Sequence, residues 1–164
     1  MQLPRFNRHE CLTPRLETQI DGKLYSNIYD RNCKLRDVSP KNGSETILLA
    51  EGVLSAIDQQ KVEMDGNYRL QYTFLQDGVR ISGECRAAGQ WILPFVSEQT
   101  EQVTIEENFV KIQKNEKIIT ILVKKGKMKL PYGIERIYQL VPGMEALKIA
   151  ILPENGEIDF CIGF

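Results

Sequence analysis

Two alternating runs of apolar and polar residues meet at Asp77-Gly78, and their spacing leaves few choices for the local fold. Asp-Gly between such runs is typical of a two-residue hairpin turn, because the turn needs positive φ angles that these residues tolerate. A slip of one residue would mix the two faces of the ladder, so the pattern predicts the register as well. The expected apolar pairs are Phe74/Ile81, Tyr72/Gly83, Leu70/Cys85 and Tyr68/Ala87, and the expected polar pairs are Thr73/Ser82, Gln71/Glu84 and Arg69/Arg86.

The same test of register predicts two further hairpins, with loops at Asn115-Glu116 and Asn155-Gly156. Asn-Gly between apolar runs is the strongest short hairpin signal. The expected pairs are Ile112/Ile119 and Val110/Ile121 around the first loop, and Ile151/Phe160, Ile149/Ile162 and Leu147/Phe164 around the second. The second hairpin would place Phe164, at the end of the sequence, in the core.

Residues 15–28 are expected to form two strands around Asp21-Gly22. A two-residue loop would put Ile20 and Leu24 on opposite faces, so the pattern favours a longer or bulged turn. Further strands are expected at 46–56, 90–96, 102–105 and 134–140, with a loop-rich connector at 31–44. Pro94 cannot donate to a ladder and therefore predicts an edge or a bulge in its strand.

With roughly ten short strands and no sustained helical period, the fold class is expected to be all-β, an antiparallel β-sandwich rich in hairpins. The length of 164 residues suits a single domain spanning 1–164, with 1–14 as an irregular N-terminal arm. Lys and Arg number 21 against 22 Asp and Glu, which argues against a nucleic-acid binder. No apolar run approaches the roughly 20 residues that span a bilayer, so no membrane association is expected.

The four cysteines have no CxxC spacing, and His9 is the one histidine, so neither a zinc site nor another cofactor is expected. A disulfide between Cys11 and Cys33 stays an open alternative. The start of the sequence lacks the apolar segment of a secretory signal, which predicts a cytoplasmic chain unless it is a piece of a longer secreted protein.

Catalytic residues are not evident in this sequence. His9 would suit general acid–base chemistry, but it lies in the N-terminal arm, where a solvated histidine is the simpler interpretation. Carboxylates are plentiful, yet no spacing brings two of them together as glycoside hydrolysis requires. We therefore name no catalytic residue.

Trp91 is the strongest candidate for ligand contact. Sugar rings stack on aromatic faces, and a strand edge beside Pro94 would offer a platform for such a ring. Arg86 and Gln90 could donate hydrogen bonds to sugar hydroxyls. The alternative is that Trp91 is a core residue of the sandwich, as tryptophans in such folds often are.

Two stretches carry a family resemblance, Asp21-Gly22-Lys23-Leu24-Tyr25-Ser26 and the segment from Tyr72 to Ile81 followed by Leu93-Pro94-Phe95-Val96. The second resembles strands in the C-terminal β-sandwich of bacterial polysaccharide-processing enzymes, and the heparinase II/III-like lyases are the nearest group. In that family the catalytic Tyr and His residues lie largely in or beside a helical toroid. The resemblance implies an accessory domain that packs on a catalytic partner or contacts glycan.

The sequence thus favours a carbohydrate-associated binding or accessory domain without catalysis of its own, with a glycan or a catalytic domain as partner. One alternative is a sugar-modifying enzyme of the mutarotase or epimerase type, which would depend on His9. Another is a protein-interaction module that uses exposed strand edges.

Overall fold

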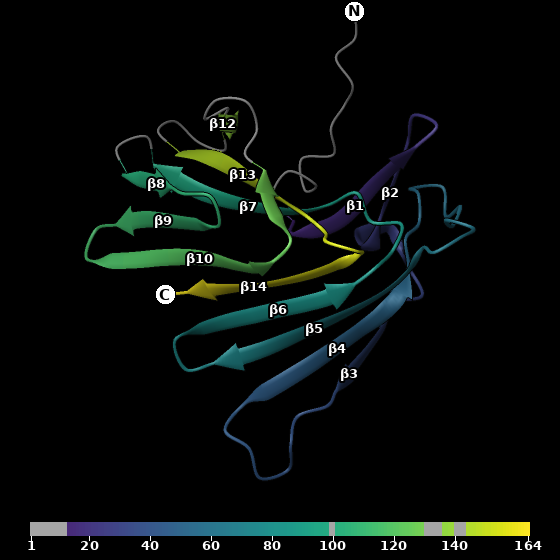
Figure 1. The fold of residues 1–164 in the computed structure, drawn as a ribbon, viewed down its shortest axis with the longest axis horizontal. Coiled ribbons are helices and arrows are strands. Elements are labelled where there is room, and N and C mark those ends of the chain that lie inside the picture. Colours follow the sequence, from purple (N-terminus) through teal and green to yellow (C-terminus); the bar gives the residue numbers. More distant parts are fainter. Residues whose placement is uncertain (1–12, 99–100, 130–135, 140–143) are drawn as a thin grey trace, which may run out of the picture.

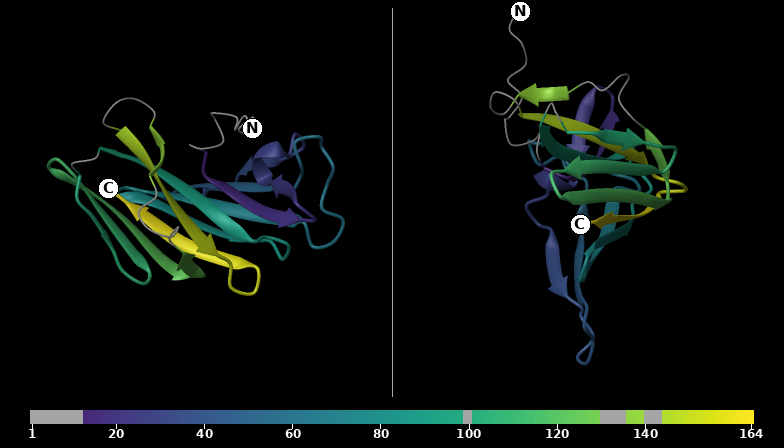
Figure 2. Two further views of the ribbon diagram at one scale, coloured as in Figure 1. Left: turned by 90° about the horizontal axis from the view of Figure 1, so that it is seen from above. Right: turned by 90° about the vertical axis from the view of Figure 1, so that its left-hand side faces the viewer.

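The computed structural model describes residues 13–98, 101–129, 136–139 and 144–164, and these form two packed antiparallel sheets (Figures 1 and 2). This confirms the predicted all-β antiparallel sandwich. The span of a single domain over 1–164 stays a prediction. Apart from a short 3-10 helix at Asn27–Tyr29, the ordered segments described are strands, and no helix among them is long and apolar enough to cross a membrane.

The six-stranded sheet runs in the order β11-β13-β7-β1-β2, with β12 also paired to β13. Its strands are β1 (Arg15–Ile20), β2 (Lys23–Ser26), β7 (Gln90–Glu98), β11 (Lys127–Lys129), β12 (Arg136–Gln139) and β13 (Met144–Leu152).

The eight-stranded sheet runs in the order β3-β4-β5-β6-β14-β10-β9-β8. Its strands are β3 (Lys34–Asp37), β4 (Thr46–Val53), β5 (Asn67–Leu75), β6 (Gly78–Glu84), β8 (Val103–Ile105), β9 (Phe109–Lys114), β10 (Lys117–Lys125) and β14 (Glu157–Gly163). We call the side of this sheet that faces the other sheet its core face, and the opposite side its outer face.

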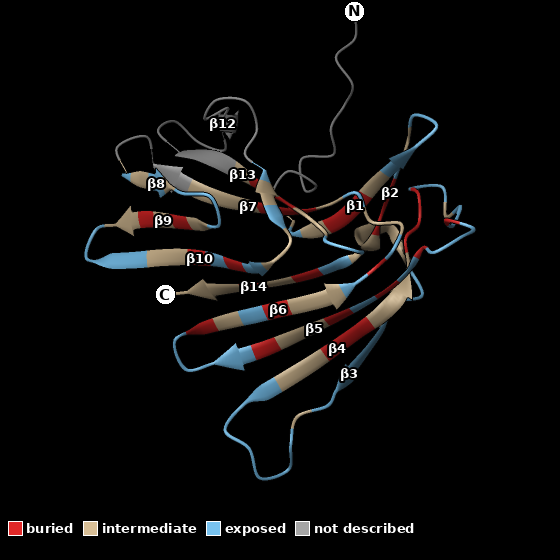
Figure 3. Ribbon diagram, in the orientation of Figure 1, coloured by how far each residue is buried: buried red, intermediate tan, exposed pale blue. Residues whose placement is uncertain are grey.

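The core lies between the two sheets because each strand points alternate side chains inward. Trp91 of β7 and Phe160 of β14 are both fully buried and meet across the sandwich, with ring centroids 5.8 Å apart. Buried and exposed residues alternate along the strands in Figure 3. The sandwich is therefore stabilised mainly by apolar burial between the layers.

The β5–β6 hairpin forms with the predicted faces but with different partners. Leu75 pairs with Gly78, so the loop is Gln76-Asp77 and each predicted pair shifts by two residues. Gly78 has no positive φ. Its lack of a side chain instead permits close contact with β14, since a Cβ there would lie 2.2 Å from the carbonyl oxygen of Ile162. A shift of two keeps the alternation intact.

Burial on the β5–β6 hairpin follows the predicted faces except near the turn. Tyr68, Leu70 and Cys85 are buried as expected. Phe74, expected in the core, is 41% exposed, whereas Thr73 on the polar face is buried. Thr73 lies between Ile47 and Arg80 in the ladder, and these longer neighbours cover it.

The β9–β10 hairpin confirms the prediction in full. Ile112 pairs with Ile119 and Val110 with Ile121, around a loop in which Asn115 has a φ of 51°.

The predicted hairpin at Asn155-Gly156 is wrong. Both residues have positive φ and form a tight turn, but β13 pairs with β7 and β11 while β14 pairs with β6 and β10. The turn links the two sheets (Figure 1). Ile151 and Phe160, expected side by side in one ladder, belong to different layers and are both buried between them. Phe164, expected in the core, is 70% exposed.

Two other local predictions need correction. Asp21-Gly22 forms a two-residue turn, with Ile20 paired to Lys23 and positive φ at both turn residues. No bulge is needed, because Ile20 and Leu24 are both partly exposed. The connector predicted at 31–44 contains the edge strand β3, whose four residues are all exposed and carry no burial pattern.

Pro94 lies where the prediction placed it, in a stretch of β7 that pairs with a single neighbour among the described strands. Strand β1 pairs with Gln90, Trp91 and Ile92, while β13 continues along the rest of β7. The missing N–H of Pro94 therefore falls beyond the part of β7 that is paired on both sides.

Candidate functional site

A groove of about 750 Å³ opens at the end of β4, β5 and β6. Strand β4 ends at Val53, β5 begins at Asn67 and β6 ends at Glu84, so three neighbouring strand ends line it. The segment before β3 and the loop between β4 and β5 contribute the remaining walls. Its lining includes charged side chains of both signs: Asp30, Lys34, Glu51, Lys61, Asp65, Arg69, Glu84 and Arg86.

Asp30 fixes one wall of the groove through its carboxylate. Its Oδ2 accepts the backbone N–H of Val53 at 2.9 Å and the hydroxyl of Tyr68 at 3.1 Å. Its Oδ1 accepts the N–H of Asn32 at 2.9 Å. A Cβ on Gly52 would lie 2.0 Å from Asp30 Oδ2, so only glycine fits beside this carboxylate. The wall is therefore rigid and pre-organised.

Tyr68 stays protonated in this wall. Burial raises the pKa of its hydroxyl well above the ordinary value, and the neighbouring Cys33 thiol and Asp30 carboxylate raise it further. A protonated hydroxyl can donate to Asp30, in agreement with the hydrogen bond. Cys33 itself is exposed, with a free thiol. The structure gives Cys33 no disulfide, and Cys11 lies outside the described residues.

The groove leaves several cations available to a ligand. Glu51 is bound by Arg36 and lies 3.7 Å from Arg69 Nε, so this carboxylate is largely neutralised. Arg86 is 83% exposed at its side chain and reaches Asp65 only at 4.0 Å. Within the described part of the chain, Lys34 and Lys61 make no side-chain hydrogen bond or ion pair.

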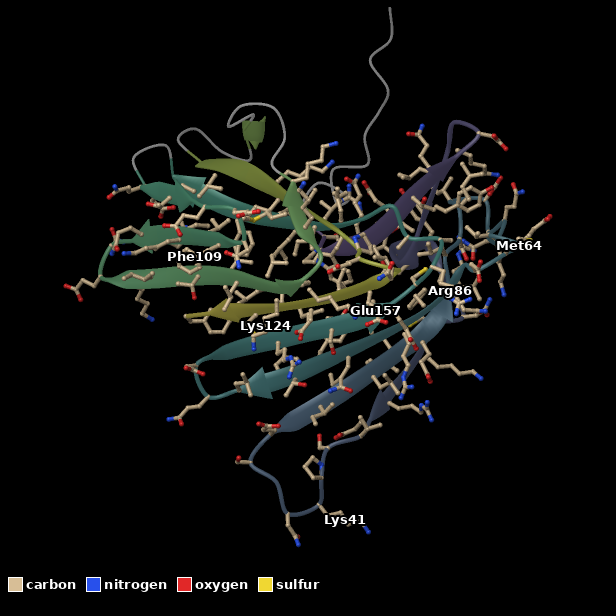
Figure 4. All side chains as sticks on the ribbon, viewed as in Figure 1. Lys41, Met64, Arg86, Phe109, Lys124 and Glu157 are labelled. Atoms are coloured by element: carbon tan, nitrogen blue, oxygen red, sulfur yellow. The ribbon has the colours of Figure 1, made fainter. Side chains whose placement is uncertain are left out.

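A second hollow of about 280 Å³ continues the groove across the outer face of the eight-stranded sheet. The two share Arg69 and Glu84. On the far side, Lys125 binds Glu157, and Arg80 makes two hydrogen bonds of 2.9 and 2.6 Å to Asp159. Arg86 and Glu157 lie along this path in Figure 4. The outer face thus offers an extended polar track that crosses the strands.

The structure separates the three ligand residues expected from the sequence. Trp91 is fully buried against Phe160 and Leu16, so its ring cannot stack on a sugar from solvent; the core interpretation is the one that fits. Gln90 precedes Trp91 on β7, in the six-stranded sheet and away from the groove, and its Nε2 donates to Glu17 Oε1 at 2.8 Å. Arg86 alone reaches the groove. Alternation along β7 explains this, since adjacent residues point to opposite faces.

The other groove residues were not singled out from the sequence. Arg69 and Glu84 fall on the polar face predicted for the hairpin, which is a usable signal. Lys34 and Lys61 come from segments with no periodicity, and only the fold brings them together. Among the residues that the structure describes, no three His, Cys, Asp or Glu side chains gather to hold a metal ion. His9 lies outside those residues.

Comparison with known proteins gives the family. The profile of the ulvan lyase C-terminal domain matches residues 1–163. A broad-specificity ulvan lyase from Formosa agariphila is 28% identical over 161 residues, which cover 94% of this chain and 25% of that protein. The chain spans about a quarter of the length of this relative.

The resemblance found in the sequence is confirmed in part. The matches indicate the C-terminal domain of a polysaccharide lyase, but they do not indicate the heparinase II/III-like group in particular. They confirm the predicted accessory domain of a polysaccharide-processing system. The chain belongs to the family of ulvan lyase C-terminal domains.

Proposed function

We propose that this chain is the glycan-binding accessory domain of a longer polysaccharide lyase, and that the groove at the ends of β4, β5 and β6 holds the polysaccharide. The observation that carries the proposal is a groove of about 750 Å³ whose lining includes the loosely paired Arg86 and the lysines Lys34 and Lys61, for which the described residues provide no ion-pair partner. An accessory domain needs a surface of this kind to keep the enzyme on its substrate.

The chemistry of the groove favours a polysaccharide that carries acidic groups. Guanidinium and ammonium groups bind carboxylate or sulfate oxygens strongly, because the hydrogen bonds are charge-assisted. The wall carboxylates Asp30 and Glu51 already have partners, so they repel an anionic ligand less. Glu84 and Asn67 can bond sugar hydroxyls. Ulvan is the first polysaccharide to test, since a relative is named an ulvan lyase.

Affinity electrophoresis tests this proposal. The chain is run through native gels that contain ulvan, a carboxylated, a sulfated or a neutral polysaccharide. We expect retardation by the acidic polysaccharides that weakens as salt is added, because the contact is largely electrostatic. Arg86→Ala and Lys61→Ala should each weaken the retardation. Lys41→Ala is the matched control, since Lys41 is exposed at the far end of the sheet (Figure 4).

Two outcomes would remove the proposal. One is a folded chain that none of these polysaccharides retards. The other is equal retardation of Arg86→Ala and Lys41→Ala, which would separate binding from the groove.

We propose further that the catalytic part of this lyase precedes the domain and is a helical toroid of the heparinase II/III-like type. Support comes from the resemblance of 72–96 to the sandwich of those lyases and from the greater length of the relative. The complete reading frame tests this directly. A frame without a helical region ahead of this domain would contradict it.

A further inference from the structure

The six-stranded sheet covers only part of the core face of the eight-stranded sheet. Along β5, Tyr68 and Leu70 are buried, whereas Tyr72 is half-buried and Phe74 is 41% exposed, although all four point to the same face. The ends of β4 and β5 near the turns are accordingly pale blue in Figure 3. The six-stranded sheet therefore leaves one corner of the core face of the eight-stranded sheet partly exposed.

The exposed and half-buried side chains at this corner form one continuous surface, which we call the open corner; three of its members, Tyr72, Val79 and Ile162, also pack against the core on their inner side. In the ladder Leu48 is opposite Tyr72, Phe74 is opposite Val79, and Val79 is opposite Ile162. Cross-strand neighbours of this kind have Cβ atoms about 5 Å apart and touch. Beyond Gly163, the last residue of β14, the N–H of Phe164 donates to the carbonyl oxygen of Asp77 at 2.9 Å, which extends the ladder by one step and places Phe164, two residues after Ile162, on the same face. The open corner consists of Leu48, Tyr72, Phe74, Val79, Ile162 and Phe164.

The open corner has the composition of a core and not of a solvated face. All six members are apolar or aromatic, and Phe164 is 70% exposed. Leu35 of β3, which is 64% exposed, extends the surface at the sheet edge. In the ladder, the charged Asp37 lies opposite Leu48 and the polar Thr46 lies opposite Phe74. By contrast, the outer face of the same strands carries the Arg80–Asp159 and Arg36–Glu51 pairs.

A contiguous apolar surface of this kind marks an interface, because a sheet stabilises a fold by burying its apolar face. We propose that the open corner is the docking surface for the part of the polysaccharide lyase that precedes this domain. The inference rests on the proposed function insofar as that function makes this chain the last domain of a longer enzyme. About three quarters of the relative lies outside the match, which supplies a large partner in the same polypeptide.

The chemistry of the corner defines the partner surface and leaves the glycan groove free. A nearly uncharged, aromatic-rich sheet face requires an apolar counterpart with few charges. The corner lies on the core face, whereas the track through Arg69, Glu84 and Glu157 lies on the outer face. The domain can therefore dock and bind polysaccharide at the same time.

Hydroxyl-radical footprinting of the full-length lyase tests the docking surface without any substitution. Labelling of each residue is compared with that of the denatured enzyme. We expect Phe74 and Phe164 to fall to the labelling of the fully buried Phe160. Met64 and Leu122, which are 78% and 40% exposed away from the corner, should stay labelled.

Three results would overturn the inference. Phe74 and Phe164 labelled as readily as Met64 would show an uncovered face. Protection that is lost on dilution of the enzyme would identify a second copy as the occupant. Protection that appears only when ulvan is added would identify the glycan.

The two proposals fail separately. If the open corner is protected but polysaccharide does not retard the domain, the glycan-binding proposal is wrong and the docking proposal stands. If the open corner is labelled but the enzyme still binds polysaccharide through Arg86, the docking proposal is wrong and the glycan-binding proposal stands.

Discussion

The indole of Trp91 is closed off from solvent between the two sheets. Its ring packs on Phe160, and its Nε1 is buried without a hydrogen-bond acceptor among the described residues. A buried donor without a partner costs free energy, which the large apolar surface of the indole offsets. The residue therefore acts through packing.

Substitutions at Trp91 should separate packing from binding. Trp91→Ala should lower the free energy of unfolding by about 3–5 kcal/mol, because it leaves a large cavity. Trp91→Phe should cost much less, since it keeps an aromatic ring and removes the unpaired N–H. Urea unfolding measures both. In gels containing ulvan, Trp91→Phe should be retarded like the wild type; weakened retardation of this folded variant would restore a ligand role for Trp91.

Tyr72 gives the chain a pH dependence in the alkaline range. Burial and, to a smaller extent, the charge of the nearby Cys33 raise the pKa of its hydroxyl to about 12. The pKa of Tyr72 in the folded chain lies above the ordinary tyrosine value of 10.0, so this contribution to stability is complete below pH 10 and is lost as the pH rises toward 12. We expect stability to fall over that window.

Absorbance of tyrosinate, followed together with unfolding, measures this effect. Tyr72 should ionise late, and Tyr72→Phe should reduce the loss of stability between pH 10 and 12, the remainder coming from Tyr68, whose pKa burial also raises. A Tyr72→Phe variant with an unchanged alkaline profile would contradict the assignment.

Much of the residue-level pattern was predictable, because alternation of polar and apolar residues determines the face of a strand. Tyr68, Leu70 and Cys85 were assigned to the core correctly. The groove was not predictable, since Lys34 and Lys61 lie in segments without periodicity and approach Arg86 only in the folded chain. Trp91 was ambiguous because the same chemistry suits a core and a sugar platform.

At the scale of elements, Asx-Gly dipeptides take three different roles in this chain. Asp21-Gly22 closes a tight hairpin, Asn155-Gly156 links the two sheets, and Gly78 allows close contact between β6 and β14. The dipeptide reports a local turn reliably. It does not report whether the strands on either side pair with each other, because that depends on which neighbours bury their apolar faces.

Gly22 and Gly156 offer a matched test of the link between the sheets. Both have nearly the same φ, 78° and 79°, but a Cβ at Gly22 meets nothing within 4 Å, whereas one at Gly156 lies 3.0 Å from Arg86 Cα. Gly22→Ala should therefore cost about 1 kcal/mol of unfolding free energy from backbone strain alone. Gly156→Ala should cost about 2–3 kcal/mol, because strain and a backbone contact add. Equal losses in urea unfolding would contradict this view of the turn.

At the scale of the whole molecule, the sandwich is built from sheets of unequal size. Alternation predicted which residues of β5 and β14 point toward the core face, but not how far the second sheet extends over them. The prediction for Phe74 and Phe164 was wrong for this reason. A sequence pattern determines the side on which a residue is buried, while cover depends on the partner layer.

The open corner should couple the unfolding of this domain to that of the rest of the lyase. If the preceding part covers Phe74 and Phe164, burial of what is now exposed contributes about 1–2 kcal/mol for Phe164, which is 70% exposed, and about 1 kcal/mol for Phe74, which is 41% exposed. Calorimetry of the full-length wild-type enzyme should then show the domain melting together with the catalytic part.

The double variant Phe74→Ser/Phe164→Ser should instead show a separate transition for this domain, at a temperature lower by about 2–4 °C for each kcal/mol of docking free energy lost. Leu122→Ser is the matched control, because Leu122 is 40% exposed on the outer face against 41% for Phe74. In the chain without the preceding part, Phe74→Ser and Leu122→Ser should shift the melting temperature by similar small amounts, since each loses a half-exposed side chain. A split transition in Leu122→Ser, or an undivided one in the double variant, would mean that another surface carries the contact.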